Sequence, residues 1–600
     1  MIDLCPVGAL TAKPSRYSAR AWELAQAPGV AAHDAVGSNV FVHTHDGRVT
    51  RVVPRDNEAV NETWISDRDR FSYTGLYAED RLLRPRLKRE GTWVEVSWET
   101  ALTHAAESLR KVAPEQIGAL LSPSLSVEEY YLAQKVLRGL GVRDLDHRVS
   151  QRDFRDDAIA PLFPWLGAPL AELENADAVL LVGCNPRREH PLIAHRLRKA
   201  ASRGASVHVV NDMLLDLTYP VQVELVGCEH DQVLALAGIA GQVAASGKSL
   251  PKKLEKVVQA AETDDPETRE ALARTARALL EGEQTHVLLG AVAMHGPAFT
   301  TLRALAGWIA RHTGARLGYL AQGANASGAW LAGAVPHRGP GGEPLDPAGA
   351  NAAEMVAQGR EAFVIAGIEP GRDGADPLAL RDTLRHAGLV VALAPFADPE
   401  LEAVADVLLP VAPHYESSGT LVNAEGRWQS YRAAARAAGE EVRPGWKVWR
   451  VLGNLLEVPG MDFLDSRAVR DELKSLLADA SFDTSVNLNQ ALVEVPDAPG
   501  SGLYRVEAAA LYSTDPLVRR AEPLQQSPEG RLAECVIVHP ESAADHADGS
   551  RVRLRQGDAE AEFTLLHDDA VPVGLAVTFA GSAASGALGM PNTTVTLARA

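Results

Sequence analysis

Short, continuous apolar segments recur along the chain, and a stretch with the spacing of an amphipathic helix follows each of them. The apolar segments span residues 117–121, 178–183, 286–290 and 362–367. Runs of this length without polar alternation are typical of strands that are buried on both faces of a parallel sheet. The pattern predicts doubly wound α/β lobes, because helices must cover both faces of such a sheet. No fixed period relates the copies, which argues against a solenoid.

Helix boundaries are readable beside several of these strands. Ser126, followed three residues later by Glu129, forms the capping-box signature of a helix that stops at Gly141. Further helices are expected near 190–202, 300–312 and 377–386, each behind an apolar segment. The glycine- and proline-rich stretch 324–350 is expected to be a long irregular loop, and loops of that length often line a site.

The two ends of the chain have a different character. Residues 1–20 read as a tail with little periodicity, and 21–95 as a small β-rich module that contains a hairpin with Asp46 and Gly47 at its turn. Residues 96–500 hold the α/β pattern. From 505 to 600, short strands separated by glycine and aspartate turns predict a compact β-barrel.

Composition excludes several classes of protein. A net charge of −19 over 600 residues argues against a protein that binds nucleic acid through the phosphate backbone. No apolar run reaches 18 residues, so any link to a membrane is expected to come through partners. The sequence also lacks CxxC, HExxH, GxGxxG and P-loop motifs. No self-sufficient catalytic motif is therefore present.

The four cysteines are too sparse for a disulfide framework, which favours a reducing compartment. Cys5 stands directly before Pro6, as the last thiolate ligand of a ferredoxin-type cluster does. Taken alone, this dipeptide is more often a stray thiol near a chain end. Cys184 follows a strand and is either a nucleophile or, more commonly, a buried apolar filler. Cys228 and Cys535 are expected to be fillers as well.

Two polar groupings have ordinary explanations. His43 and His45 share one face of a strand and could bind a metal, but without a third ligand a solvated strand face is the favoured interpretation. His190 and His195 are five residues apart on a helix, so no ligand role is expected for them. The basic cluster between residues 81 and 89 is expected to be a hydrated connector, with a partner contact as the alternative.

Several longer motifs, in one order along the chain, closely resemble the G subunit of bacterial NADH:quinone oxidoreductase, which is the large iron–sulfur subunit of respiratory complex I. They are 5–17 (CPVGALTAKPSRY), 21–24 (AWEL), 51–55 (RVVPR), 60–67 (VNETWISD), 70–73 (RFSY), 185–191 (NPRREHP), 324–330 (ANASGAW), 333–342 (GAVPHRGPGG) and 419–427 (GTLVNAEGR). The last hundred residues match the family only in general character.

The resemblance implies a molybdopterin-oxidoreductase-like body: a small β module, two doubly wound α/β lobes and a C-terminal β-barrel. It also implies that residues 1–20 are the remnant of a 4Fe-4S ferredoxin-type region, in which Cys5 matches the fourth ligand of one cluster. Family members carry further clusters on an N-terminal extension that this sequence does not include. One thiolate cannot assemble a cubane, so the chain alone is expected to hold no stable 4Fe-4S cluster.

The β module departs from molybdenum enzymes, because the CxxC-x3-C cluster motif that they place there is absent. We therefore expect no molybdenum and assign no catalytic residue. Cys5 is the single residue expected to bind a cofactor or metal.

The function implied by the resemblance is that of a component of the peripheral arm of complex I. This component takes part in electron transfer from NADH through iron–sulfur clusters to quinone, and this chain serves mainly as scaffold. The expected partners are the other peripheral-arm subunits, on the cytoplasmic side of the inner membrane. Two alternatives remain: a catalytic molybdopterin oxidoreductase resembling formate dehydrogenase, and an α/β protein that binds a nucleotide.

Overall fold

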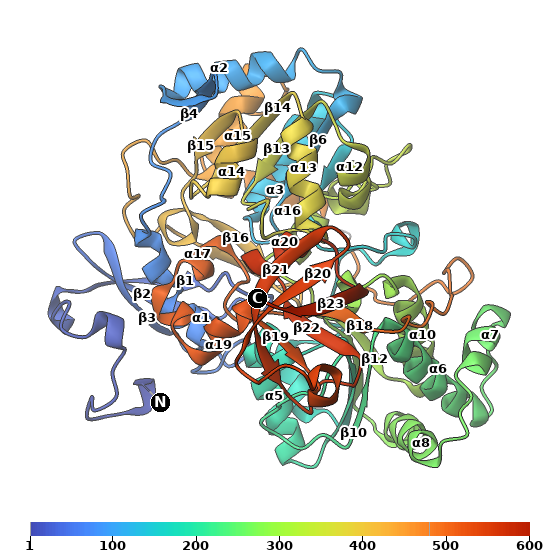
Figure 1. Ribbon diagram of the computed structural model, residues 1–600. Coiled ribbons are helices and arrows are strands. Elements are labelled where there is room, and N and C mark those ends of the chain that lie inside the picture. Colours follow the sequence, from blue (N-terminus) through green and yellow to red (C-terminus); the bar gives the residue numbers. More distant parts are fainter. Residues whose placement is uncertain (1, 479) are drawn as a thin grey trace.

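The computed structural model describes residues 2–478 and 480–600 (Figure 1). Near the N-terminus, β1 (Ala25–Val30), β2 (Asn39–His45) and β3 (Arg48–Pro54) form an antiparallel sheet. Asp46 and Gly47 connect β2 to β3 with φ angles of 50° and 79°. Two successive positive φ values define the tight turn whose twist matches the flanking strands, which confirms the predicted hairpin. Helices α1 (Asp67–Phe71) and η4 (Ser72–Tyr77) follow.

A five-stranded parallel sheet forms the first lobe, with strand order β10-β9-β8-β11-β12. Its central strands are buried along their whole length, as continuous apolar runs predict. The strands are β8 (Ala178–Val182), β9 (Ser206–Asn211), β10 (Val223–Val226), β11 (Thr285–Leu289) and β12 (Arg316–Tyr319). The helices of this lobe are α4 (Pro186–Glu189), α5 (Pro191–Ser202), α6 (Glu229–Ala245), α7 (Lys252–Ala260), α8 (Pro266–Glu281), α9 (Ala291–His295) and α10 (Phe299–Thr313).

The second lobe is a seven-stranded sheet of order β5-β4-β15-β14-β13-β6-β7, in which five strands are parallel and β4 and β5 form an antiparallel edge. Its strands are β4 (Arg86–Arg89), β5 (Thr92–Glu95), β6 (Ile117–Leu121), β7 (Asp144–Asp146), β13 (Ala362–Ala366), β14 (Leu389–Ala394) and β15 (Val407–Pro410). Its helices are α2 (Trp98–Leu109), α3 (Val127–Gly139), α12 (Ala352–Gln358), α13 (Pro377–His386), α14 (Pro399–Val404), α15 (Gly445–Leu455) and α16 (Ser466–Leu476).

The C-terminal strands close into a barrel of order β18-β22-β19-β21-β20-β23, as the sequence predicts. These strands are β18 (Leu503–Ala508), β19 (Cys535–Val538), β20 (Arg551–Gln556), β21 (Ala559–His567), β22 (Leu575–Phe579) and β23 (Thr593–Arg599). Short helices lie between them: α17 (Pro516–Arg519), α18 (Glu522–Gln525), α19 (Pro528–Arg531) and α20 (Ala583–Leu588). Figure 1 shows the barrel, in red, in front of the region where the two lobes meet.

Two features of the organisation differ from the sequence-based expectation. Residues 86–95, grouped there with the β module, form the β4–β5 edge of the seven-stranded sheet, because Leu87 pairs with Val407 of β15. The second lobe is also discontinuous, since the whole first lobe lies in sequence between β7 and β13. In addition, the expected irregular loop 324–350 contains helix α11 (Ala326–Leu331).

Candidate cofactor crevice

A crevice of about 1360 Å³, including the part that is open to solvent, lies among the two lobes, the β module and the barrel. In the first lobe, the chain runs outward from β8 through β9 to β10 and then returns to β11 on the other side of β8. The carboxyl ends of β8 and β11 therefore form a topological switch point, which is where open α/β sheets bind ligands. Residues 188–190, at the end of α4, and residues 291, 292 and 295–298, in and after α9, line the crevice.

The strand ends at this switch point are closely packed. A Cβ atom on Gly290 would lie 2.5 Å from the Cα of Cys184, and one on Gly183 would lie 2.4 Å from the backbone nitrogen of Ala293. Cys184 itself is fully buried, and burial raises the pKa of its thiol well above the usual value. The structure thus confirms Cys184 as an apolar filler rather than a nucleophile.

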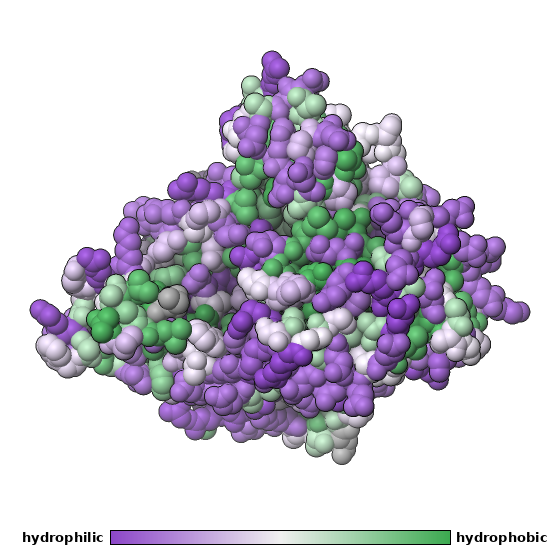
Figure 2. All heavy atoms as spheres, turned by 90° about the horizontal axis from the view of Figure 1, so that it is seen from below, coloured by the Kyte–Doolittle hydropathy of each residue, from purple (hydrophilic) through white to green (hydrophobic). Residues whose placement is uncertain are grey.

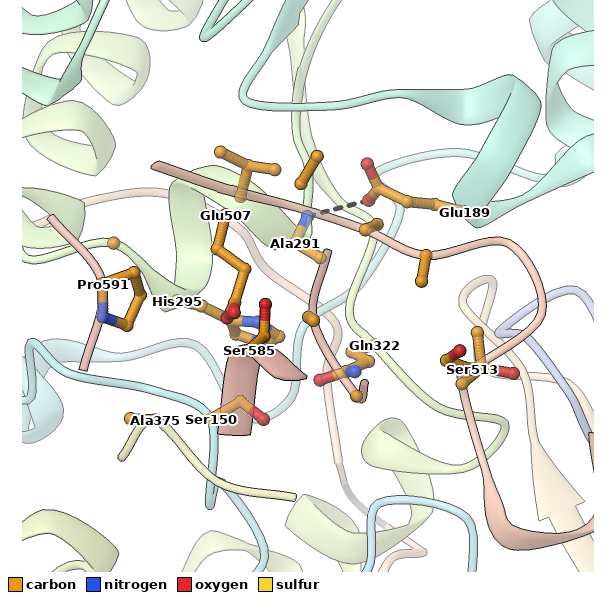
Figure 3. Close-up of a pocket in the computed structure, with 18 of the residues that line it drawn as sticks. Ser150, Glu189, Ala291, His295, Gln322, Ala375, Glu507, Ser513, Ser585 and Pro591 are labelled. Atoms are coloured by element: carbon orange, nitrogen blue, oxygen red, sulfur yellow. Dashed lines mark hydrogen bonds between the residues drawn. The ribbon is translucent and has the colours of Figure 1, made fainter. Parts of the chain in front are cut away.

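Glu189 places its carboxylate on the backbone donors of the switch point. One oxygen accepts from the backbone N–H of Asn185 at 2.6 Å and the other from the N–H of Ala291 at 3.0 Å (Figure 3). Burial raises the pKa of Glu189 to about 7, although these two hydrogen bonds act in the opposite direction. The backbone groups that would receive an anionic ligand here are already occupied by the chain's own side chain.

The β module and the barrel reach the crevice through buried charged groups. Arg68 of α1 is 1% exposed and donates to Asp34 at 3.1 Å and to the backbone oxygen of Glu189 at 2.7 Å. His33 pairs through Nδ1 with Asp515 at 2.8 Å and contacts the hydroxyl of Ser72 through Nε2 at 2.6 Å. These contacts join four segments that are distant in sequence.

The acidic side chains that follow β13 in the second lobe are paired with arginines of the same chain. Arg519 of α17 donates to Glu369 at 2.8 Å and also pairs with Asp373, and Arg520 pairs with Glu369 and Asp80. On the barrel side, Arg152 donates to the backbone oxygen of His295 at 2.9 Å and to Asn592 at 2.6 Å. These arginines of the crevice are therefore engaged by protein acceptors.

Asp212, directly after β9, differs from these paired groups. It is 3% exposed, and its Oδ2 has no hydrogen-bond partner among the described residues. Burial raises its pKa to about 6. Sequence reasoning missed Asp212, Glu189 and Arg68, because a single charged residue at a strand end or in a short helix carries no periodic signal.

Two sequence-based interpretations are wrong in the structure. His43 is buried rather than solvated: its Nε2 lies 3.0 Å from Gln26 Oε1, and its Nδ1 accepts from Arg51 at 2.8 Å. The basic cluster is not a hydrated connector throughout, because Arg81 is buried and makes a bidentate pair with Glu416 at 2.8 and 3.2 Å. Arg81 finds its partner in a segment that the sequence does not place beside it, whereas Arg51 lies opposite His43 in the predicted hairpin.

Cys5 lies outside the crevice, in the N-terminal segment. Backbone N–H groups lower the pKa of its thiol, with Leu10 the largest contributor and Ala9, Val7 and Gly8 adding to it, against a smaller effect of burial. Gly8 has a φ of 65°, which lets the backbone turn around the sulfur. The turn from Cys5 to Leu10 thus stabilises a thiolate, the form that binds iron.

Large apolar side chains are exposed in the N-terminal segment that contains Cys5. Five large apolar side chains there are 46–89% exposed: Leu4, Val7, Leu10, Tyr17 and Trp22. Figure 2 shows an apolar patch at the left, on the side where this segment lies in Figure 1. An apolar concentration of this kind on a surface indicates an interaction site.

Comparisons with known proteins define the class. The model of the molybdopterin oxidoreductase family matches residues 81–455, and this chain belongs to that family. Acetylene hydratase from Pelobacter acetylenicus has the same fold, with a TM-score of 0.67 over 92% of this chain and 93% of the hydratase at 13% identity.

Among curated relatives, the G subunits of the NADH-quinone oxidoreductases of Mycobacterium tuberculosis and Mycobacterium bovis are each 31% identical over 79% of this chain and 58% of their own length. The corresponding G subunit of Rickettsia conorii is 40% identical over 33% of this chain and 29% of its own length. Residues 25–74 match the NADH-ubiquinone oxidoreductase NDSU1/NuoG-like 4Fe-4S domain. The chain thus spans less than two thirds of these relatives.

The residues present do not fit the two cofactors that these families imply. Molybdopterin bears phosphate, but the Glu189 carboxylate accepts from the backbone N–H groups of Asn185 and Ala291, and Arg519 is paired with Glu369 and Asp373. Residues 25–74 match a 4Fe-4S domain, which implies an iron–sulfur cluster, yet they contain no cysteine. Over the described part of the chain, no group of three or more His, Cys, Asp or Glu side chains is arranged to hold a metal ion.

Proposed function

We propose that this chain forms the molybdopterin-oxidoreductase-like body of the G subunit of an NADH-quinone oxidoreductase and acts mainly as scaffold in the peripheral arm of complex I. The similarity to two mycobacterial G subunits over 79% of the chain carries the proposal. In this role the chain contacts other peripheral-arm subunits, on the cytoplasmic side of the inner membrane. Within the described residues, no helix is long and apolar enough to cross a bilayer.

Cys5 is the group through which the chain takes part in electron transfer. The other cysteines cannot join it, because Cys184, Cys228 and Cys535 are all buried, two of them in separate apolar cores of the lobe and barrel. A 4Fe-4S cluster on Cys5 therefore takes its three remaining thiolates from outside these 600 residues. The polypeptide segment that supplies them, whether it belongs to this chain or to another subunit, packs on the exposed apolar segment 4–22.

In this proposal, the electrons enter the complex at another subunit. NADH gives up two electrons at another subunit, the electrons pass singly through iron–sulfur clusters, and a quinone takes up two electrons and two protons to become a quinol. In this proposal, the chain binds neither NADH nor quinone. Its contribution is to hold one cluster ligand and to shape the surface on which neighbouring subunits assemble.

Affinity isolation of the tagged chain from its own cells tests the proposal. We expect co-isolated protein that oxidises NADH, reduces a quinone and contains iron without stoichiometric molybdenum. Isolation of the chain by itself, or with one molybdenum atom per chain and no NADH oxidation, contradicts the proposal. The second result favours a catalytic molybdopterin oxidoreductase, the alternative that the saturated crevice donors argue against.

A further inference from the structure

A side chamber of about 690 Å³ opens from the crevice between the two lobes. Ser150, His295 and Gln322 line both cavities and so mark the junction between them (Figure 3). Arg152 donates to the backbone oxygen of His295 rather than to its imidazole. The junction is a polar rim, whereas the chamber behind it is lined by Phe299, Trp330 and other apolar groups.

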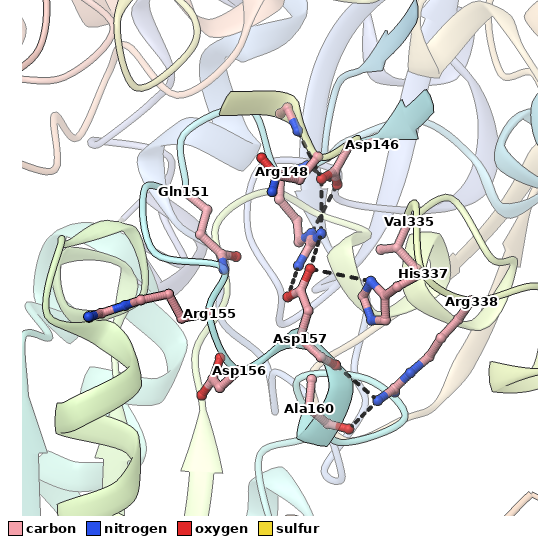
Figure 4. Close-up of polar contacts among 12 residues, drawn as sticks. Asp146, Arg148, Gln151, Arg155, Asp156, Asp157, Ala160, Val335, His337 and Arg338 are labelled. Atoms are coloured by element: carbon pink, nitrogen blue, oxygen red, sulfur yellow. Dashed lines mark hydrogen bonds and ion pairs between the residues drawn. The ribbon is translucent and has the colours of Figure 1, made fainter. Parts of the chain in front are cut away.

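The charged groups of the chamber wall are already balanced. Arg148 pairs with Asp157 at 2.6 Å and also with Asp146 behind it (Figure 4). Arg303 pairs with Asp156 at 2.7 Å. His147 and His295 are neutral at pH 7, because burial lowers the pKa of each to about 4. Two arginines thus face two lining carboxylates, and a charged ligand would find no counterion.

Unpartnered donors lie deep in the chamber. Tyr319, from β12, is 1% exposed, and its hydroxyl has no hydrogen-bond partner in the described part of the chain. Burial raises the pKa of Tyr319 to about 12 despite the nearby charge of Arg303, so the hydroxyl keeps its proton at pH 7. A buried donor without an acceptor costs about 1–3 kcal/mol, and a ligand that supplies an acceptor here would recover part of that cost.

From these observations we propose that the side chamber binds a flat, uncharged aromatic molecule that presents a hydrogen-bond acceptor to the Tyr319 hydroxyl. Phe299, Tyr319 and Trp330 line the chamber, and guanidinium groups also pack on two of these rings: Arg303 lies 5.8 Å from the centroid of Phe299, and Arg148 lies 5.0 Å from that of Trp330. The arginines of the chamber wall are already paired with carboxylates, which disfavours a charged ligand. The polar residues at the junction with the crevice can orient the outer edge of the ligand. This site is separate from Cys5 and does not depend on the proposed function.

Calorimetric titration of the full chain with three matched probes tests the site. Coumarin is flat, uncharged and carries a carbonyl acceptor; naphthalene lacks the acceptor; coumarin-3-carboxylate adds a charge. We expect saturable coumarin binding, about five-fold weaker binding of naphthalene and at least about ten-fold weaker binding of the carboxylate. Absence of saturable coumarin binding, or equal or tighter binding of the carboxylate, overturns the proposal.

Two variants locate the binding. Tyr319→Phe keeps the ring, so the chain should fold normally while its coumarin affinity falls to that for naphthalene. Tyr17→Phe, at a residue 89% exposed in the N-terminal segment, is the matched control and should change nothing. Ala326→Leu, which places a larger side chain in the chamber wall, should weaken both probes. If Tyr319→Phe binds coumarin as the unmodified chain does, the hydroxyl does not recognise the ligand and the proposal fails.

Discussion

Glu189 shows how one side chain can replace a ligand. Its carboxylate accepts hydrogen bonds from Asn185 and Ala291, at the strand ends where related folds place bound molecules. The carboxylate is desolvated in this position, which is why its pKa rises to about 7. The Glu189 carboxylate thus takes the place that a bound anion would have at these strand ends, and its hydrogen bonds hold the protein together there.

Glu189→Gln should therefore change both stability and its pH dependence. The amide has one acceptor oxygen in place of two, so one backbone N–H loses its partner at a cost of about 1–3 kcal/mol. In the unmodified chain, the folded state holds the Glu189 proton more tightly than the unfolded state. Its contribution to the free energy of unfolding is thus full below pH ~4.5 and is lost as the pH rises through about 7.

Denaturant unfolding at about pH 4.5, 6 and 8 measures this difference. The variant should lack the part of the decline in stability that Glu189 causes as the pH rises from about 4.5 to about 7. Glu107→Gln, on the exposed face of α2, is the control and should follow the unmodified chain. Parallel pH profiles for Glu189→Gln and the unmodified chain would show that Glu189 is not the titrating group.

The His33–Asp515 pair gives a second prediction at this scale. Burial lowers the pKa of His33, but the charge of Asp515 and its hydrogen bond outweigh burial and raise it. Burial raises the pKa of Asp515, and the charge of His33 and its hydrogen bond bring it down to about 2. The histidine's stabilisation is present below pH ~6.5, and the aspartate's is present above pH ~4.

Asp515→Asn should cost about 3 kcal/mol near pH 5.5, because a buried histidine loses its counterion. The cost should be smaller at about pH 9, because the stabilisation from His33 declines as the pH rises above about 6.5. Asparagine can still accept from the backbone of α17, so the helix cap is kept. Unfolding curves at both pH values, with exposed Asp545→Asn as control, check this. A cost that does not change between the two pH values would rule out the ion pair.

At the scale of elements, capping residues and apolar runs predicted the bounds of individual helices and strands well, because these bounds depend on neighbouring residues. Ser126 caps α3 by accepting from the N–H of Glu129, and Glu129 in turn accepts from the backbone N–H of Ser126. The predicted helix 377–386 and strand 117–121 have the same bounds as α13 and β6. By contrast, β15 pairs with β4 across a long separation in sequence, and no local pattern reports such a pairing.

Ser126→Ala should destabilise the chain by about 1 kcal/mol, because the first turn of α3 loses its acceptor. Thermal unfolding of the variant measures the loss. Ser108→Ala, within α2, is the matched control: the helix gains a residue of higher propensity, and we expect a change below about 0.5 kcal/mol. Equal melting temperatures for Ser126→Ala and the unmodified chain would contradict the role of the cap.

For the whole molecule, the sequence predicted which types of domain are present but not how these domains pack against one another. The β module, α/β lobes and barrel followed from strand and helix periodicity together with a family resemblance. The crevice did not, because it is built from Arg68, Asp212, Arg519 and others whose partners come from remote segments. The family resemblance, rather than the Cys5-Pro6 dipeptide alone, singled out Cys5, while the surrounding amides and exposed apolar residues became visible only in three dimensions.

The central claim is that this scaffold contributes one thiolate to a cluster whose other thiolates come from outside these 600 residues. Electron paramagnetic resonance of the reduced complex, isolated through the tagged chain, tests it most directly. With Cys5→Ala, we expect one iron–sulfur signal to disappear and the iron content to fall by about four atoms per complex. Cys535→Ala, which removes a buried barrel thiol, should leave the spectrum unchanged. An unaltered spectrum and iron content in Cys5→Ala would contradict the account.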